Sequence, residues 1–196
     1  MQLHKRDVVE AATALLDNYG IADLSMRRLA RELAVSPGAL YWHFANKQQL
    51  LGAVADRILQ PISSQANPPP EPGHWRESIT RTCKQLREAL LSYTDGAELV
   101  SASFAAGQSK AMSNVLAQLS AAATEAGVAS GHAELAARSV IYYVLGFTAD
   151  EQSRMQWDAA GADVTHTILT ENPNARFAFG LSLLVDGIAT HSRADV

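Results

Sequence analysis

The sequence is short of cysteine and of long apolar runs. Its 196 residues include one cysteine, Cys83, which excludes an internal disulfide and any metal site built from clustered cysteines. No apolar run approaches the roughly 18 to 20 residues that a membrane-spanning helix needs. The N-terminal stretch MQLHKRDVVEAA contains acidic residues before any apolar segment develops, unlike a signal peptide. These absences predict a cytoplasmic protein with no membrane partner, and Cys83 is expected to be a small core residue.

Catalytic motifs are missing as well. The sequence contains no Ser-His-Asp order with a glycine-rich nucleophile turn, no phosphate-binding glycine loop and no helical pair of metal ligands. Asp150 and Glu151 are adjacent on a predicted helix, so their carboxylates point in different directions, unlike those of a two-carboxylate active site. We therefore expect no enzyme, no catalytic residue, no metal and no cofactor.

No segment alternates apolar and polar residues as a β-strand would, whereas apolar residues recur at helical spacing throughout. The sequence therefore predicts an all-α fold with a helix-turn-helix head and a C-terminal helical bundle. The helices are expected at 5–19, 26–33, 37–43, 47–60, 74–92, 96–106, 109–126, 131–155, 160–170 and 174–191. The proline-rich stretch 67–73 interrupts this pattern, because proline removes backbone donors. The predicted domains are a head (1–47), a connecting helix (48–66), a linker (67–73) and a body (74–196).

The second and third predicted helices are joined by a short connection. Ser25 and Ser36 stand at N-cap positions, and Pro37 suits the first position of a helix. A connection of three residues, 34–36, between two short helices is typical of the helix-turn-helix, whose second helix lies in the DNA major groove.

Four rings follow one another in the third helix, at Tyr41, Trp42, His43 and Phe44. Leu40 and Phe44 are four residues apart and share one face, which leaves the other three rings outside. Exposed rings with polar atoms can bind phosphate oxygens, and this would explain their number. The alternative is an ordinary core cluster, or a helical interaction module or small-molecule-binding protein that does not bind DNA.

Net charge leaves DNA binding open. The chain has a net charge of −4, but residues 1–60 contain seven Lys or Arg and six Asp or Glu, while the rest contains nine and fourteen. A weakly basic head on an acidic body can bind DNA if its cations share one face.

Two stretches show a family resemblance. Residues 24–54, LSMRRLARELAVSPGALYWHFANKQQLLGAV, resemble the DNA-binding head of the TetR family. Residues 75–99, WRESITRTCKQLREALLSYTDGAEL, resemble the first ligand-domain helix of its tetracycline-repressor subgroup and the turn after it. The resemblance implies a homodimeric transcriptional repressor that binds a palindromic double-stranded DNA operator and is released by a small-molecule effector.

The resemblance also assigns DNA contacts. It places Arg27 at a base edge and makes three further residues face bases: Pro37, Gly38 and Ala39. It assigns mainly phosphate contacts to Tyr41, Trp42, His43 and Lys47. The three base-facing residues differ from the larger polar groups of the tetracycline repressor, so its operator sequence is not transferred. Arg27 has an alternative role, as an ion-pair partner of Asp23 or Glu32.

The ligand pocket departs from the subgroup. Ser63 and Val100 stand where the tetracycline repressor has two histidines, and Val100 has no lone pair for a metal, so magnesium-bound tetracycline is not the expected effector. We expect a more apolar molecule. The candidate lining residues are Ser63, Thr82, Leu86, Val100, Phe104, Leu116, Gln118, Tyr143 and Phe147. Each of them has an alternative role as a plain core residue.

Dimerisation is indicated by two segments, 133–147 and 177–188, that are apolar around more than one face. Small residues, including Gly146 and Gly180, permit helices to approach closely. A helix apolar on two sides must bury both, and a second copy of the chain would form a two-fold four-helix interface. The alternative is a helix fully buried within one chain.

Overall fold

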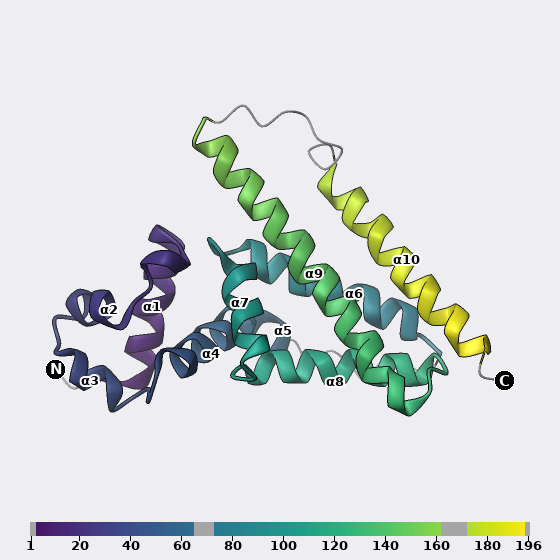
Figure 1. Ribbon diagram of the computed structural model, residues 1–196, viewed down its shortest axis with the longest axis horizontal. Helices are drawn as coiled ribbons and strands as arrows, with labels where there is room; N and C mark the ends of the chain where they lie inside the picture. Colours follow the sequence, from purple (N-terminus) through teal and green to yellow (C-terminus); the bar gives the residue numbers. More distant parts are fainter. Residues whose placement is uncertain (1–2, 65–72, 162–171, 195–196) are drawn as a thin grey trace. The chain divides into compact units, whose positions relative to one another are not determined.

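The structure is a computed structural model that describes residues 3–64, 73–161 and 172–194 (Figure 1). Every regular element in these ranges is a helix, which confirms the predicted all-α class. Contacts divide the chain into two units, which we call the N-terminal unit (Met1–Ser64 with Glu88–Ser113) and the C-terminal unit (Gln65–Arg87 with Asn114–Val196). This division by contacts does not test the domain boundaries predicted from the sequence, which stay a prediction.

The N-terminal half of the chain forms a series of short helices. They are α1 (Lys5–Tyr19), the 3₁₀ turn η1 (Ile21–Asp23), α2 (Met26–Glu32), α3 (Pro37–Tyr41), α4 (Lys47–Ile58), α5 (Gln60–Ser64) and α7 (Gly96–Ala105). The longer helices are α6 (Trp75–Leu91), α8 (Lys110–Glu125), α9 (Ser130–Ala159) and α10 (Pro173–Ala194). Most of the predicted helices are present within a few residues of their expected ends.

Two predicted helices differ from the structure, and another lies mostly outside the described residues. The third ends at Tyr41 instead of residue 43, because the N–H groups of His43 and Phe44 both bond to the carbonyl of Leu40 and close a tight turn. The connecting helix predicted at 48–66 is divided in the structure, because α4 ends at Ile58 and a separate helix, α5, contains Pro61 in its first turn, where proline is tolerated. Most of the helix predicted at 160–170 lies outside the described residues.

Apolar residues of α1, α2, α3 and α4 form the core of the head. Val8 and Leu16 of α1, Leu29 of α2, Leu40 of α3 and Val54 of α4 are all fully buried. Helix α2 begins at the predicted N-cap, because the Ser25 hydroxyl accepts a hydrogen bond of 3.2 Å from the backbone N–H of Arg28. Local capping and shared burial therefore fix where the short helices start and which face each one buries.

The turn between α2 and α3 contains a residue in a left-handed conformation. The connection is residues 33–36, one residue longer than predicted, and Ala34 within it has a φ of 52°. The N–H of Ala34 bonds to the carbonyl of Arg31, and the N–H of Val35 bonds to that of Ala30. This is the Schellman pattern, in which glycine is the usual left-handed residue because it has no Cβ to clash.

Replacing Ala34 with glycine is expected to stabilise the protein by about 0.5–1 kcal/mol, because it removes the steric cost of the left-handed conformation. Chemical denaturation monitored by circular dichroism at fixed protein concentration is the measurement. Ala39→Gly is the control, because residue 39 lies inside α3 and glycine there is expected to destabilise. A destabilised Ala34→Gly variant would contradict this account of the turn.

Three aspartates join residues 88–113 to the head within the N-terminal unit. The Asp17 carboxylate accepts a hydrogen bond of 3.1 Å from the N–H of Thr94. The Asp95 carboxylate accepts one of 2.9 Å from the N–H of Ile21. Asp56, on α4, accepts bonds of 2.7 Å from the Ser109 hydroxyl and 2.9 Å from the Ala111 N–H. Helix α7 is therefore attached to the head at both of its ends.

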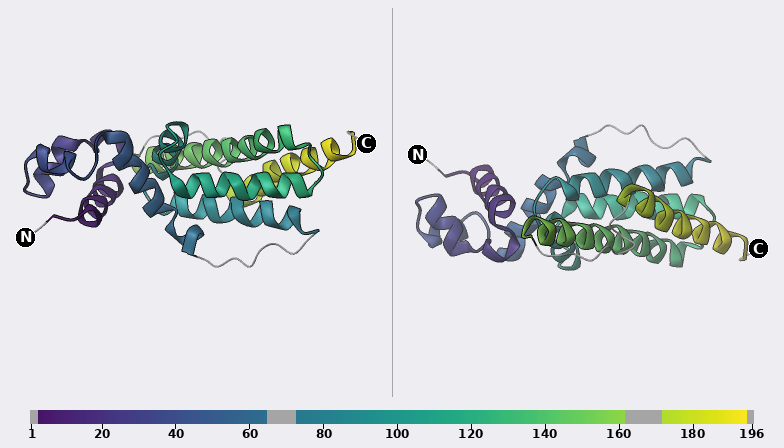
Figure 2. Two further views of the ribbon diagram at one scale, coloured as in Figure 1. Left: turned by 90° about the horizontal axis from the view of Figure 1, so that it is seen from below. Right: turned by 90° about the horizontal axis from the view of Figure 1, so that it is seen from above.

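The C-terminal unit is a bundle built from α6, α8, α9 and α10 (Figure 2). Its core is apolar: Ile79 and Leu86 of α6, Leu119 of α8, Val144 of α9 and Phe177 of α10 are all buried. Helices α9 and α10 also contact each other through Tyr143, whose hydroxyl donates a 2.9 Å hydrogen bond to the carbonyl of Phe177. The faces of α9 and α10 that point away from this core are exposed, and they include large apolar side chains.

Cys83 lies in the core of the C-terminal unit, as expected for a small core residue, with 0% of its side chain exposed. Burial raises the pKa of this thiol to about 12, so it stays protonated at neutral pH. A protonated buried thiol is a poor nucleophile. The cysteine therefore has a packing role.

Candidate nucleic-acid interface

Helix α3 presents two very different faces. Leu40 is fully buried and Phe44, just beyond the helix, is 1% exposed. Tyr41 is 52% exposed, Trp42 is 91% exposed and His43 is half-buried. The predicted division of the rings is confirmed for Tyr41, Trp42 and Phe44, whereas His43 is only partly exposed. An indole that stands almost wholly in solvent is unusual, because burying a large apolar side chain is favourable.

The N-terminal end of α3 is small and open. Pro37 and Gly38 are exposed and Ala39 is half-buried. A Cβ built at Gly38 would meet nothing closer than the Ser36 hydroxyl at 3.8 Å, so the fold of the chain leaves room for a larger residue. Because Gly38 has no side chain, its backbone is accessible, which permits a partner to approach closely.

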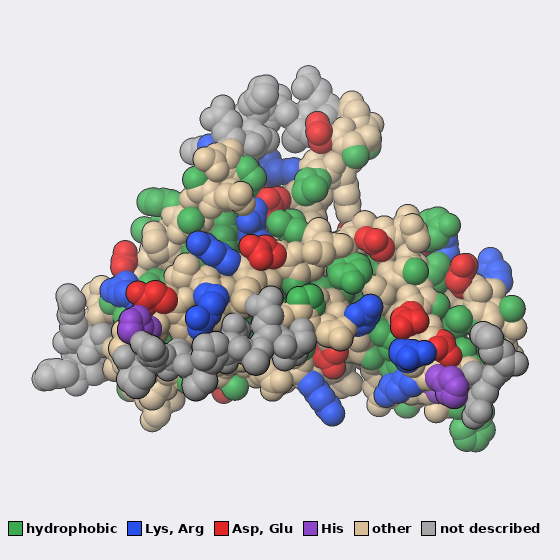
Figure 3. All heavy atoms as spheres, turned by 180° about the vertical axis from the view of Figure 1, so that it is seen from behind, with side chains coloured by type: hydrophobic (Ala, Val, Ile, Leu, Met, Phe, Trp, Pro, Cys, Tyr) green, Lys and Arg blue, Asp and Glu red, His purple; other side chains and the backbone are tan. Residues whose placement is uncertain are grey.

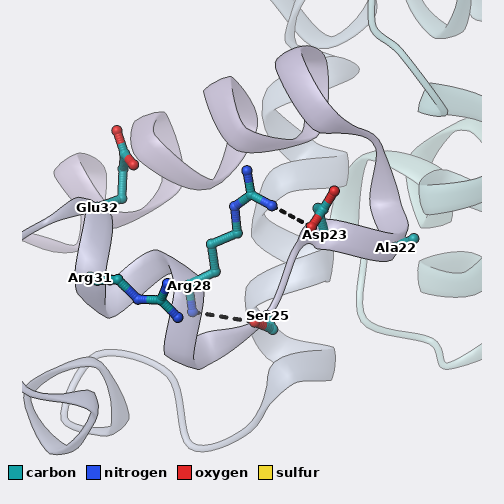
Figure 4. A pocket seen from close by; sticks show the side chains of 6 residues that line it. All are labelled: Ala22, Asp23, Ser25, Arg28, Arg31 and Glu32. Carbon is teal, nitrogen blue, oxygen red and sulfur yellow. Dashed lines mark hydrogen bonds and ion pairs between the residues drawn. The ribbon is translucent and has the colours of Figure 1, made fainter.

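Arg27 lies in the first turn of α2 with its side chain exposed, and among the described residues no carboxylate forms an ion pair with it. The alternative role, in which Arg27 pairs with Asp23 or Glu32, is not found among the described residues. Asp23 instead forms an ion pair with Arg28 (Figure 4). The Arg28 guanidinium also lies 4.1 Å from the centre of the Tyr19 ring. Arg27 is therefore available to an external partner.

Lys47 is the first residue of α4 and is exposed. The Asn46 side chain caps this helix by accepting a 2.9 Å hydrogen bond from the N–H of Gln49, so the cap fixes the start of the helix without using the lysine. Lys47 is thus a second exposed cation close in sequence to the rings of α3.

The candidate ligand residues divide between the two units. Thr82 and Leu86 are buried on α6, Leu116 is half-buried and Gln118 is exposed on α8. Val100 and Phe104 lie on α7, which belongs to the N-terminal unit, and the Ser63 side chain lies outside the described residues. The structure brings Tyr143 and Phe147 together on α9, with ring centroids 5.8 Å apart. Burial raises the pKa of the Tyr143 hydroxyl, opposed by the charge of Arg87.

Sequence reasoning missed a buried ion pair beside these rings. The Arg87 guanidinium, on α6, donates to both carboxylate oxygens of Glu151 on α9, at 2.9 and 2.6 Å. It also donates to the Asn174 side chain of α10 at 2.9 Å and lies 5.0 Å from the Phe177 ring centre. The partners are 64 and 87 residues away in sequence, so no local pattern marks them.

Comparison with known proteins identifies the family. Residues 8–54 match the bacterial regulatory proteins of the tetR family, and residues 67–170 match the tetracyclin repressor-like C-terminal domain. The tetracycline repressor protein class A from transposon 1721 of Escherichia coli is 33% identical over 202 residues, covering 96% of this chain and 91% of the repressor. The chain belongs to the TetR family.

Solved TetR-family structures extend the match. The crystal structure of Mycobacterium smegmatis BioQ is 60% identical, covers 97% of this chain and 99% of BioQ, and superimposes with a TM-score of 0.87. A crystal structure of BioQ with its natural double-stranded DNA operator is 58% identical over 97% of this chain and 100% of BioQ, with a TM-score of 0.83. The protein is a TetR-family DNA-binding transcriptional regulator and not an enzyme.

Among residues 3–64, 73–161 and 172–194, no helix is long and apolar enough to cross a membrane. In the same ranges, no three His, Cys, Asp or Glu side chains gather closely enough to hold a metal ion.

Proposed function

We propose that the protein is a homodimeric repressor that binds a palindromic operator through α2, α3 and the start of α4. The observation that supports this most directly is the 91% exposure of Trp42 on a helix-turn-helix whose relative BioQ has been crystallised with its operator. In this arrangement Arg27 reads a base edge, and three further residues face bases: Pro37, Gly38 and Ala39. Phosphate contacts come from Tyr41, Trp42, His43 and Lys47.

These roles follow from the chemistry of each side chain. An arginine can donate two hydrogen bonds to O6 and N7 of guanine, which distinguishes that base in the major groove. Pro37 and Ala39 present apolar surface suited to a thymine methyl group. The tyrosine hydroxyl, indole N–H and lysine ammonium donate to phosphate oxygens, which fixes the position of the head without reading sequence. Sequence preference therefore depends mainly on Arg27 and the small residues of α3.

The proposed dimer uses α9 and α10. Leu135 and Tyr142 of α9 are 60% and 58% exposed, and Phe179 and Leu183 of α10 are 66% and 58% exposed. The two helices also line a groove of about 520 Å³ that contains Leu135, Val140, Leu183 and Ile188. Apolar side chains gathered on one surface mark an interaction site. A second copy of the chain would cover this face in a two-fold interface and would place two DNA-binding heads on one operator.

The effector proposed for this repressor is a small, largely apolar molecule that releases DNA. Support comes from the apolar and aromatic residues of the candidate pocket, among them Leu86, Tyr143 and Phe147, with Thr82 as a hydroxyl group. Such a composition is usual for a small-molecule site. The effector must bind more tightly to the DNA-free arrangement of the dimer than to the bound one, because only differential affinity can shift the equilibrium.

The test of DNA recognition is selection of bound duplexes from a random-sequence pool by the purified protein at fixed salt, followed by sequencing. The expected result is an inverted repeat whose half-site centres are about one helical turn apart, roughly 34 to 36 Å. Enrichment of a single half-site would contradict the dimeric mode. No enrichment at low salt would contradict operator binding by the free protein.

Leu183→Glu is expected to disrupt the dimer, because it would place an unpaired carboxylate and its symmetry mate in an apolar interface. The dissociation constant of the dimer is expected to rise at least about 30-fold, since burying such a charge costs on the order of 2–5 kcal/mol. Sedimentation velocity over a concentration series measures the change. Ala121→Glu on α8 is the control, because Ala121 is exposed and does not line the groove. A Leu183→Glu variant with an unchanged dissociation constant would exclude this interface.

A further inference from the structure

The lysines and arginines of residues 1–60 differ in whether another side chain binds their charged group. Arg6 pairs with Glu10 at 3.7 Å, and Arg28 pairs with Asp23. Lys5 lies 4.8 Å from the ring centre of Phe44, and Arg57 donates to the side chain of Gln60. Among the described residues, three cations of this segment are left without such a partner: Arg27, Arg31 and Lys47. Arg27 and Lys47 already have DNA contacts in the proposed function, and Arg31 has none.

Arg31 lines an open hollow of about 560 Å³ at the surface of α2. The hollow is lined by Ala22, Asp23, Ser25, Arg28, Arg31 and Glu32 (Figure 4). Its two acidic residues do not neutralise Arg31. Asp23 is paired with Arg28, and the Glu32 side chain points away from that of Arg31 (Figure 4). The hollow therefore contains one unneutralised guanidinium that is exposed to solvent.

Arg31 lies four residues after Arg27 on the same helix. Residues at this spacing lie on one face, with Cβ atoms about 5–6 Å apart. In a helix-turn-helix the first of the two helices crosses the DNA backbone, and the major groove is about 12 Å wide. A guanidinium one turn beyond a base-reading arginine therefore falls at the edge of the groove, where the phosphates run.

The charge of the chain makes a single cation important. The chain has a net charge of −4, and acidic and basic side chains are interspersed on the face shown in Figure 3. Where positive charge is sparse, affinity depends on individual cations held at the correct distance from phosphates.

We propose that Arg31 binds a phosphate of the operator backbone in the hollow on α2, beyond the contacts made by α3 and Lys47. Arg28 is the neighbouring cation that does not bind phosphate, because Asp23 and the Tyr19 ring hold it within the head. The inference rests on the DNA-binding function. It assigns to Arg31 a positioning contact that strengthens binding to every DNA sequence alike.

The experiment measures the affinity of the full-length protein for its selected operator and for a scrambled duplex, by fluorescence anisotropy over a series of salt concentrations. Arg31→Gln is expected to reduce the slope of log K against log salt by about one for each head engaged. The ratio of the DNA affinity of the wild type to that of the variant then falls about threefold per head between roughly 50 and 200 mM salt. The loss is expected to be equal on both duplexes.

Two control variants complete the test. Arg31→Lys retains the charge and is expected to restore the slope, while Arg28→Gln is expected to leave it unchanged. An unaltered slope in Arg31→Gln, or a loss confined to the operator, would overturn the phosphate assignment. A wild type that binds neither duplex would instead contradict the proposed function, so the two failures are distinguishable. Circular dichroism of each variant shows whether the head remains folded.

Discussion

Glu151→Ala is expected to lower the free energy of unfolding by about 3–5 kcal/mol, because it leaves the buried Arg87 guanidinium without its counter-charge. The two side chains are 9% and 14% exposed, and both carboxylate oxygens accept hydrogen bonds from Arg87. The alternative partner, Asn174, supplies one neutral oxygen. Urea denaturation at fixed protein concentration measures the loss, since association of the chain would make stability depend on concentration.

Two further variants separate burial from charge. Asp186→Ala breaks the 2.8 Å ion pair between Arg76 and Asp186, which also joins two helices of the C-terminal unit. In this pair the Arg76 side chain is 43% exposed and the Asp186 side chain is 70% exposed. Its expected cost is about 0–1 kcal/mol. The double substitution Arg87→Met with Glu151→Leu removes both charges and is expected to recover most of the stability, because no buried charge remains unpaired. Equal losses in Glu151→Ala and Asp186→Ala would contradict this explanation.

Arg27→Ala is expected to abolish the preference for one base pair in each half-site, at about 1–3 kcal/mol for each arginine. In a dimer both half-sites are affected, so the operator should lose roughly 30-fold or more in affinity while scrambled DNA loses little. A competition binding assay, with operators that each carry one substituted base pair, identifies the base pair that Arg27 reads.

Lys47→Ala is the contrast to Arg27→Ala. A lysine that contacts phosphate contributes to binding whatever the sequence, so its loss should weaken operator and scrambled duplexes to the same degree and reduce the salt dependence. If Arg27→Ala also weakened both duplexes equally, Arg27 would be a phosphate contact and base reading would depend on α3 alone.

The short helices of the head were predictable because their signals are local. Ser25 and Asn46 are each three residues from the N–H groups that they cap. The four-residue spacing of Leu40 and Phe44 was enough to predict which rings of the third helix are buried and which are exposed. Capping and helical periodicity act within one turn, so the amino-acid order alone reveals them.

Other features were not predictable because they depend on residues distant in sequence. The attachment of α7 to the head relies on Asp17, Asp56 and Asp95, whose bonding partners lie 53 to 77 residues away. In the sequence, Arg87 is indistinguishable from the other charged residues of an amphipathic helix. Only the fold brings Glu151 into contact with it. The left-handed conformation of Ala34 was missed for a different reason, because glycine is the residue that usually marks such a turn.

The contact between Tyr143 and Gly180 limits the order in which this protein can evolve. A Cβ on residue 180 would lie 2.3 Å from the Tyr143 hydroxyl and 2.6 Å from the ring carbon that bears it, and the hydroxyl is bonded to the carbonyl of Phe177. A larger residue at 180 thus requires the Tyr143 ring to move and its bond to Phe177 to break, unless residue 143 is already smaller. In descendants of this sequence, loss of the tyrosine is expected to precede the gain of a side chain at position 180.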